Sequence, residues 1–143
     1  MAIRTASSRW TGTLTEGAGV MRTGKGGYEG NFSFKSRFEE GEGTNPEELI
    51  GAAQAGCFSM FLSKVLADAG HPPTSIETTA NVHLEPVDGK QTVTRIELST
   101  SAEVPGIDEA EFTKSVEISK ENCPISRLLS PGTQVTVVSA KLA

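Results

Sequence analysis

Two cysteines are the residues of this 143-residue chain with the most distinctive chemistry. Cys57 and Cys123 are widely separated, and neither belongs to a Cys-x-x-Cys pair. The two histidines, His71 and His83, have no ligand spacing to the cysteines, which argues against a zinc site. Nucleophilic attack and reversible oxidation to a disulfide are therefore the chemistries that these thiols suggest.

The surroundings of the cysteines leave open which of them is the nucleophile. Cys57 lies in a strongly apolar stretch, where a free thiol commonly serves as a small hydrophobic side chain. Cys123 precedes Pro124 at an expected helix start, where backbone N–H groups and the helix dipole stabilise a thiolate. A cysteine hydrolase with His71 or His83 as its base is an alternative, but both histidines are expected at the surface.

Composition and charge narrow the classes of partner. The net charge is −5 and the pI is about 5.1, so the chain lacks the basic surface that binds phosphate backbones or anionic lipids. No apolar run reaches the roughly 18 residues of a membrane span, and the first ten residues lack the apolar core of a signal peptide. We expect a cytoplasmic protein with no nucleic-acid or membrane partner, folded as a single domain over residues 1–143.

The strongest structural pattern is a long helix that contains Cys57. Asn45 is the expected N-cap, Pro46 the first helical residue and Glu48 the acid of a capping box, and the helix should end near Gly70. It would run for about 25 residues, on the order of 37 Å. Its middle is apolar almost all round, which predicts burial on more than one face.

A chain of this size has difficulty covering such a helix by itself. Gly51, Ala52, Ala55 and Gly56 form a small-residue surface that would let another backbone approach closely. A second copy of the helix at a subunit interface would use this surface. Close packing against the chain's own sheet is the equally favoured alternative.

The other elements are short strands and two further helices. In the third β-like run, which extends to Phe38, a period of two places Lys35 and Arg37 opposite a Phe-lined face. Asp88-Gly89 predicts a hairpin turn, and Asp108 opens an amphipathic helix. The order predicts an α+β fold, with an antiparallel sheet packed on a long central buried helix. The expected strands are Arg9–Leu14, Gly19–Thr23, Asn31–Phe38, Ile76–Leu84, Gln91–Thr100 and Thr133–Leu142, and a short helix is expected from Pro124.

Five segments, in order along nearly the whole chain, form a recognisable pattern: Ser36–Glu39, Gly43–Ala53, Cys57–Met60, Val104–Asp108 and Cys123–Ser126. Together they resemble the OsmC subgroup of the OsmC/Ohr family. Gly56 departs from the alanine that is common before the helix cysteine. Glu16-Gly17 stands where the Ohr subgroup carries its arginine, which favours OsmC over Ohr.

The resemblance implies a thiol peroxidase that reduces organic hydroperoxides. Carried over residue by residue, Cys57 is the attacking thiol and Cys123 the resolving thiol, and Arg37 and Glu47 form the pair that activates Cys57. The implied fold is an intertwined homodimer with the long helices at its centre. The family also implies no metal or bound cofactor and an external dithiol reductant such as a lipoyl group.

Helix geometry distinguishes Glu47 from Glu48. At 100° per residue, Glu47 lies about 80° from Cys57 around the axis, whereas Glu48 lies about 180° away and suits the capping role. Ten residues of rise still separate Glu47 from Cys57 by about 15 Å. We therefore expect the partner subunit to supply Glu47, with Arg37, to each Cys57. From sequence alone, a surface arginine and a dipole-compensating glutamate are the alternatives for these two residues.

A thiol with a pKa near 8.5 is only about 3% ionised at pH 7, so the site must favour the anion. An apolar wall beside the thiol would favour organic hydroperoxides over hydrogen peroxide. The candidate wall residues, each of which could equally be core, are Phe34, Phe38, Phe58, Met60, Phe61 and Ile125.

A domain of the same fold that senses redox state through its disulfide, without turnover, is the alternative function.

Overall fold

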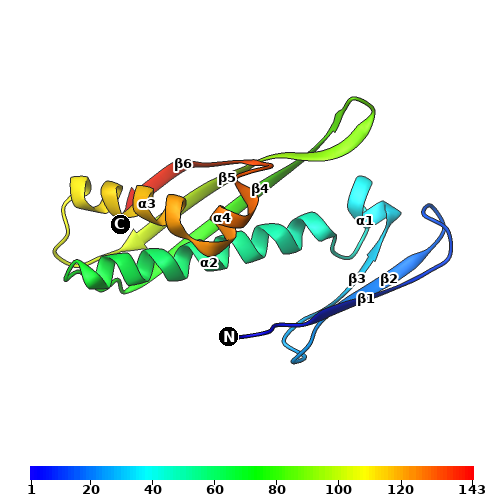
Figure 1. Cartoon of the computed structure of the whole chain (residues 1–143), viewed down its shortest axis with the longest axis horizontal. Helices are drawn as coiled ribbons and strands as arrows, with labels where there is room; N and C mark the ends of the chain where they lie inside the picture. Colours follow the sequence, from blue (N-terminus) through cyan, green and yellow to red (C-terminus); the bar gives the residue numbers. More distant parts are fainter. The chain divides into compact units, whose positions relative to one another are not determined.

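A computed structural model describes residues 1–143, and it confirms the α+β class. Figure 1 shows the six strands and four helices along the chain. They form two compact units, Met1–Leu49 and Ile50–Ala143, each of which carries a three-stranded sheet. The first unit is called the N-terminal unit below, and the second the C-terminal unit.

The N-terminal unit is an antiparallel sheet followed by a short helix. Strands β1 (Ala6–Thr11), β2 (Ala18–Thr23) and β3 (Glu29–Ser33) pair in the order β1-β2-β3. The rings of Trp10 on β1 and Phe32 on β3 pack with their centroids 5.1 Å apart. Because Gly19 of β2 lies between these strands, opposite both residues, the two large rings can meet over it.

The strand prediction for residues 34–38 is wrong, because this segment forms helix α1 (Phe34–Phe38). Ser33 caps the helix: its Oγ accepts from the N–H of Ser36 at 3.2 Å, and Ser36 Oγ accepts from the N–H of Ser33 at 2.9 Å. This capping box closes a helical turn directly after β3. Phe34 and Phe38 then lie one turn apart with ring centroids 5.0 Å apart, and the period-two placement of Arg37 does not apply.

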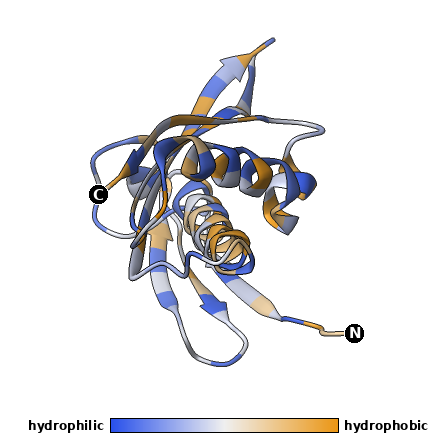
Figure 2. Ribbon diagram, turned by 90° about the vertical axis from the view of Figure 1, so that its left-hand side faces the viewer, coloured by the Kyte–Doolittle hydropathy of each residue, from blue (hydrophilic) through white to orange (hydrophobic).

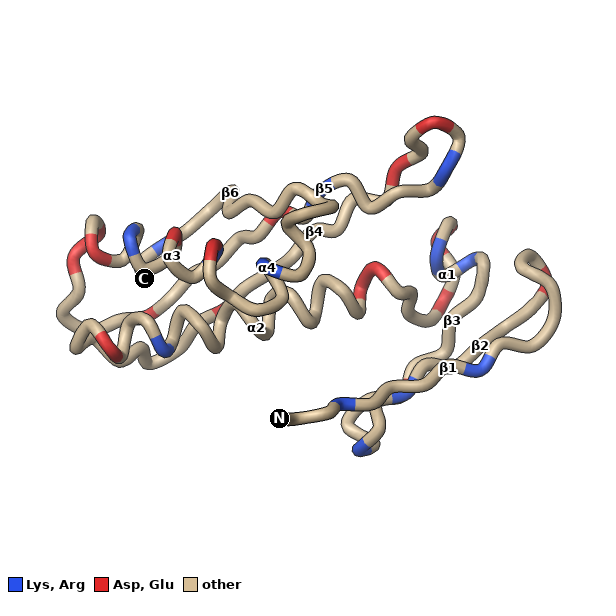
Figure 3. Tube along the Cα trace, viewed as in Figure 1, with Lys and Arg blue, Asp and Glu red and all other residues tan.

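Helix α2 (Pro46–Asp68) begins as the sequence predicts. Asn45 Oδ1 accepts a 2.8 Å hydrogen bond from the backbone N–H of Glu48. After the last turn, Gly70 has a φ of +88°, a conformation that suits glycine and ends the helix. Figure 3 shows a long uncharged stretch along the middle of the helix. By length and composition this helix could also cross a membrane, contrary to expectation, although a helix in a protein core meets the same test.

In the single chain, α2 is not buried on all sides. Phe58, Leu62 and Leu66 repeat every four residues and are fully buried in the core. On another face Met60 is 78% exposed, and Ala52, Ala53 and Gly56 are also exposed. Figure 2 views the helix nearly along its axis and shows hydrophobic and neutral residues around much of its circumference. The apolar surface thus exceeds what the chain itself covers.

The small residues of α2 lie partly in the packed contact with β4 and partly on the exposed face of the helix. A Cβ added to Gly51 would lie 3.3 Å from Val82 Cγ2, so Gly51 is closely packed against β4. A Cβ on Gly56 would meet nothing within 4 Å. Packing against the chain's own sheet therefore accounts for Gly51 and leaves Gly56 uncovered.

The sheet of the C-terminal unit is mixed, not purely antiparallel as predicted. β4 (Ser75–Val87) and β5 (Lys90–Glu103) form an antiparallel hairpin across Asp88-Gly89, where both residues have positive φ. β6 (Gln134–Leu142) pairs parallel to β5. The connection between β5 and β6 contains α3 (Glu109–Asn122) and α4 (Pro124–Leu129), which is the crossover that a parallel pair requires.

The Asn45 cap should contribute measurably to stability. We predict that Asn45→Ala lowers the free energy of unfolding by about 1 kcal/mol, since one helix N–H loses its partner. Urea unfolding followed by circular dichroism measures this. Asn81→Ala, at an exposed strand position, is the control and should change stability by less than about 0.5 kcal/mol. Equal effects of the two substitutions would contradict the capping role.

Candidate active site

The two cysteines meet in the C-terminal unit. The sulfur atoms of Cys57, on α2, and Cys123, between α3 and α4, are 2.7 Å apart although 66 positions separate them in the sequence. Both are free thiols; Cys123 is fully buried and Cys57 is partly exposed. Burial alone would not bring two distant cysteines into contact, so this arrangement suits thiol–disulfide chemistry.

The local sequence explains why the chain presents Cys123 at this point. Asp108 caps α3 through a 2.8 Å bond from the N–H of Glu111, and the helix ends at Asn122. Cys123 has φ −54° and ψ 128°, because the residue before a proline avoids the helical conformation. Pro124 then begins α4, so Cys123 sits at the bend between two helices.

The groups around Cys57 in the C-terminal unit favour its protonated form. Burial raises the pKa of the Cys57 thiol above its ordinary value, and so does the hydrogen bond with the Cys123 side chain. The backbone N–H of Ile125 donates to the sulfur and opposes this rise in pKa. A reactive thiolate would therefore need a further positive charge.

The predicted arginine and glutamate meet in the N-terminal unit. Arg37 donates two hydrogen bonds to the Glu47 carboxylate, from Nη2 to Oε1 at 2.7 Å and from Nε to Oε2 at 3.2 Å. Glu47 is only 8% exposed. Its neighbour Glu48 accepts from Thr44 Oγ1 at 2.8 Å and takes part in the helix cap. Glu47 is thus ion-paired with Arg37, whereas Glu48 lies at the helix cap.

An apolar cavity of about 310 Å³ lies beside Arg37 in the N-terminal unit. Phe34 and Phe38 line it, as proposed for the wall residues, whereas Phe58 is fully buried in the core of the other unit. Trp10 and Leu14 also line the cavity, and sequence reasoning missed both. Alternation along the predicted strand Arg9–Leu14 places them on one face and could have pointed to them. The complete lining is Trp10, Leu14, Phe32, Ser33, Phe34, Arg37 and Phe38.

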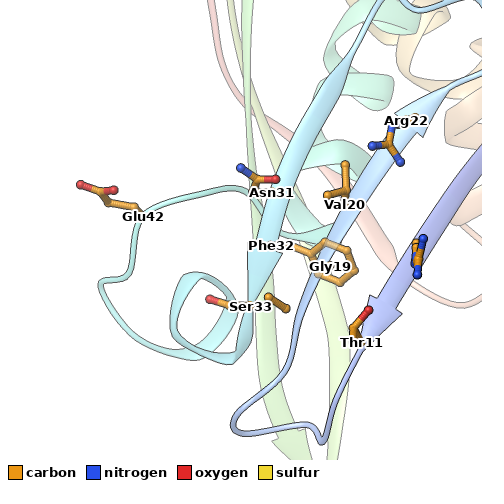
Figure 4. A pocket seen from close by; sticks show the side chains of 10 residues that line it. Thr11, Gly19, Val20, Arg22, Asn31, Phe32, Ser33 and Glu42 are labelled. Carbon is orange, nitrogen blue, oxygen red and sulfur yellow. The ribbon is translucent and has the colours of Figure 1, made fainter.

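A second pocket, of about 350 Å³, lies on the sheet of the same unit. Figure 4 shows Arg22, Asn31 and Val20 around it. Arg22 is engaged by Glu29, with Nε and Oε2 2.5 Å apart. None of the four predicted site residues lines this pocket.

The histidines pair with carboxylates. His71 Nε2 lies 3.3 Å from Glu111 Oε2, and His83 Nε2 lies 2.8 Å from Glu97 Oε2. Neither ring hydrogen-bonds a cysteine, which removes the geometric basis for the cysteine–histidine hydrolase alternative.

The profile of OsmC-like proteins matches residues 39–138. The chain belongs to the OsmC-like family. It is 46% identical over 123 residues to peroxiredoxin OsmC of Escherichia coli strain K12, covering 85% of this chain and 86% of that protein. It is 32% identical over 101 residues to an organic hydroperoxide resistance protein of Xanthomonas axonopodis pv. citri, covering 70% and 69% of the two chains.

Solved structures of OsmC-like proteins share the fold. An organic hydroperoxide resistance protein from Legionella pneumophila matches with a TM-score of 0.73 at 22% identity, covering 99% of both chains. One from Elizabethkingia anophelis matches with a TM-score of 0.75 at 21% identity, again over 99% of both chains. The profile match and the 46% identity confirm the family that the sequence motifs indicate. At 21–22% identity the solved structures support the fold alone.

The contact with Cys123 should be visible in the titration of Cys57. We predict that Cys123→Ala lowers the pKa of Cys57, because it removes a hydrogen bond and a coulombic interaction that favour the protonated thiol. The pH dependence of alkylation at Cys57, resolved by peptide mass spectrometry, measures the pKa. Cys123→Ser keeps a hydrogen-bonding group and should shift the pKa less. A Cys57 pKa that rises in Cys123→Ala would contradict this.

Proposed function

We propose that this OsmC-like protein is a cysteine peroxidase that reduces organic hydroperoxides to alcohols. Cys57 is the attacking thiolate and Cys123 the resolving thiol. The observation that carries the proposal is the 2.7 Å contact between these two sulfurs. The names of the relatives, peroxiredoxin and organic hydroperoxide resistance protein, support the same class of reaction.

The reaction requires two steps at sulfur. The Cys57 thiolate attacks the distal peroxide oxygen, the O–O bond breaks, and the departing alkoxide takes a proton to become the alcohol. Cys57 is left as a sulfenic acid, which condenses with the Cys123 thiol to give a disulfide and water. An external dithiol, of the lipoyl type, reduces the disulfide by exchange. No bound metal or cofactor takes part in this scheme.

Arg37 is the proposed source of the positive charge that the thiolate needs. Lowering a thiol pKa by two units requires about 2.7 kcal/mol of preferential interaction with the anion. A guanidinium held near the sulfur in a water-poor site can supply this interaction. Glu47 holds the guanidinium in one orientation through its two hydrogen bonds.

A partner subunit is the proposed origin of this Arg37–Glu47 pair. Glu47 and Cys57 are ten residues apart on α2, a rise of about 15 Å, which is too long for a direct contact within one chain. The exposed apolar face of α2, which includes Ala52, Gly56 and Met60, fits a second copy of the same helix. We therefore place the active sites of an intertwined homodimer at the subunit interface, with the α2 helices central.

The apolar cavity beside Arg37 is the proposed site for the organic part of the substrate. Burial of an alkyl tail contributes about 0.8 kcal/mol per CH₂, which favours organic hydroperoxides over hydrogen peroxide.

We further propose that residues 1–143 act as one domain of a cytoplasmic enzyme. A redox-sensing domain that forms the same disulfide without turnover is the alternative, and steady-state consumption of hydroperoxide distinguishes the two.

We predict sustained reduction of cumene hydroperoxide by the wild-type protein with a lipoyl dithiol. Cys57→Ser should abolish turnover, because it removes the nucleophile. Consumption of hydroperoxide, followed by chromatography of the alcohol product, measures the rate. Ser63→Ala, at a partly buried hydroxyl elsewhere on α2, is the control and should retain activity. A wild type without turnover, or an active Cys57→Ser variant, would refute the peroxidase assignment.

Subunit mixing tests the origin of Arg37. Cys57→Ser and Arg37→Met should each be inactive alone. In a heterodimer, the intact Cys57 of one subunit would meet the intact Arg37 of the other, so random mixing should restore about a quarter of wild-type activity. Activity after unfolding and refolding the mixture measures this, with light scattering to verify dimers. If Arg37 served the thiol of its own chain, the mixture would stay inactive.

A further inference from the structure

A buried amide lies next to the cysteine pair in the C-terminal unit. Gln54 on α2 is fully buried, and its Nε2 donates a 2.7 Å hydrogen bond to Oγ of Ser126 on α4, which is also fully buried. Cys57 and Cys123 bring the same two segments together. Two side-chain hydrogen bonds therefore tie α4 and its N-cap to α2.

These two bonds are adjacent. Gln54 precedes Cys57 by three residues, and Ser126 follows Cys123 by three. Residues three apart on a helix are neighbours, with a rise of about 4.5 Å. From Gln54 to Cys57 the chain runs forward, whereas from their partners Ser126 to Cys123 it runs backward. The two segments are therefore antiparallel, and the two bonds between them are neighbours. Movement of Ser126 away from Gln54 would therefore also separate the sulfurs.

Helix α4 needs contacts with other elements, of which the bond to Gln54 is one and the packing of Leu129 on the core is another. It has only six residues, and no side chain caps its N-terminus. Isolated helices shorter than about 12 residues are marginal in water, so the position of α4 rests on contacts with other elements. In the reduced protein no covalent bond joins α4 to α2.

Packing alone does not explain the amide of Gln54. Its Oε1 is buried and has no hydrogen-bond partner. A buried acceptor without a donor is destabilising, and a methionine would fill a similar volume without this cost. The value of the glutamine therefore lies in the bond that its Nε2 makes to Ser126.

We propose that Gln54 is a positioning residue for the resolving thiol. By bonding Ser126 it keeps α4 docked on α2 in the reduced protein and holds Cys123 within reach of Cys57. This inference rests on the proposed Cys57–Cys123 disulfide. Its consequence is that the Cys57 sulfenic acid condenses with Cys123, releasing water, before a second hydroperoxide converts it to a sulfinic acid.

The variant Gln54→Met tests this proposal. The equilibrium constant for closing the Cys57–Cys123 disulfide against glutathione should fall about threefold to tenfold, the factor that one net hydrogen bond provides. The equilibrium constant falls because, without the bond between Gln54 and Ser126, α4 must also become ordered when the disulfide closes. Sulfinic acid at Cys57 per hydroperoxide consumed, measured by mass spectrometry, should rise. Ser126→Ala removes the other half of the bond and should act alike, and the double variant should add nothing further.

Ser59→Ala is the matched control. Ser59 lies on the same helix and donates a 2.8 Å hydrogen bond to Thr78 on β4, so its loss loosens α2 without affecting α4. Its disulfide equilibrium constant should stay within about twofold of the wild type. Unchanged constants in Gln54→Met and Ser126→Ala, or an equal fall in Ser59→Ala, would overturn the role of Gln54. If the wild-type protein forms no disulfide, both the role of Gln54 and the proposed function are overturned.

Discussion

The contact between the Cys57 and Cys123 sulfurs is the constraint on which the rest of the site depends. It requires one helix to present a thiol on its partly exposed side and another segment to bring a second thiol to it from 66 residues away. Pro124 makes this possible, because it ends one helical segment at Cys123 and begins the next. The crossover between β5 and β6 therefore also places Cys123 beside Cys57.

The thiols and the proposed source of positive charge belong to different units of the chain. Around Cys57, burial and the neighbouring thiol hold the pKa above its ordinary value, whereas Arg37 and Glu47 form a complete ion pair in the N-terminal unit. A raised pKa disfavours the reactive thiolate, and a guanidinium beside the sulfur would favour it. In the proposed homodimer, assembly would therefore create both the active site and its reactivity.

The sequence predicted the parts of the site that local chemistry determines. Asn45, Pro46 and Glu48 marked the start of α2 because capping depends on a few adjacent residues, and this left Glu47 free to pair with Arg37. Residues 34–38 were predicted wrongly because their alternation of aromatic and polar residues outweighed the Ser33 cap. The parallel pairing of β5 with β6 depends on a long crossover rather than on either strand's own sequence. Gln54 is one of the few polar residues in the apolar middle of α2, but its proposed role depends on Ser126, far away in the chain, and so could not be predicted.

Peptide mapping after a single oxidation would show whether Cys57 and Cys123 react as a pair. Fully reduced protein would be treated with one equivalent of cumene hydroperoxide, blocked with an alkylating agent and digested without reductant. The account predicts one alcohol formed per chain and a peptide pair linked through Cys57 and Cys123 of the same chain. Two alkylated cysteines with the hydroperoxide unconsumed, or a Cys57–Cys57 link between chains, would contradict it.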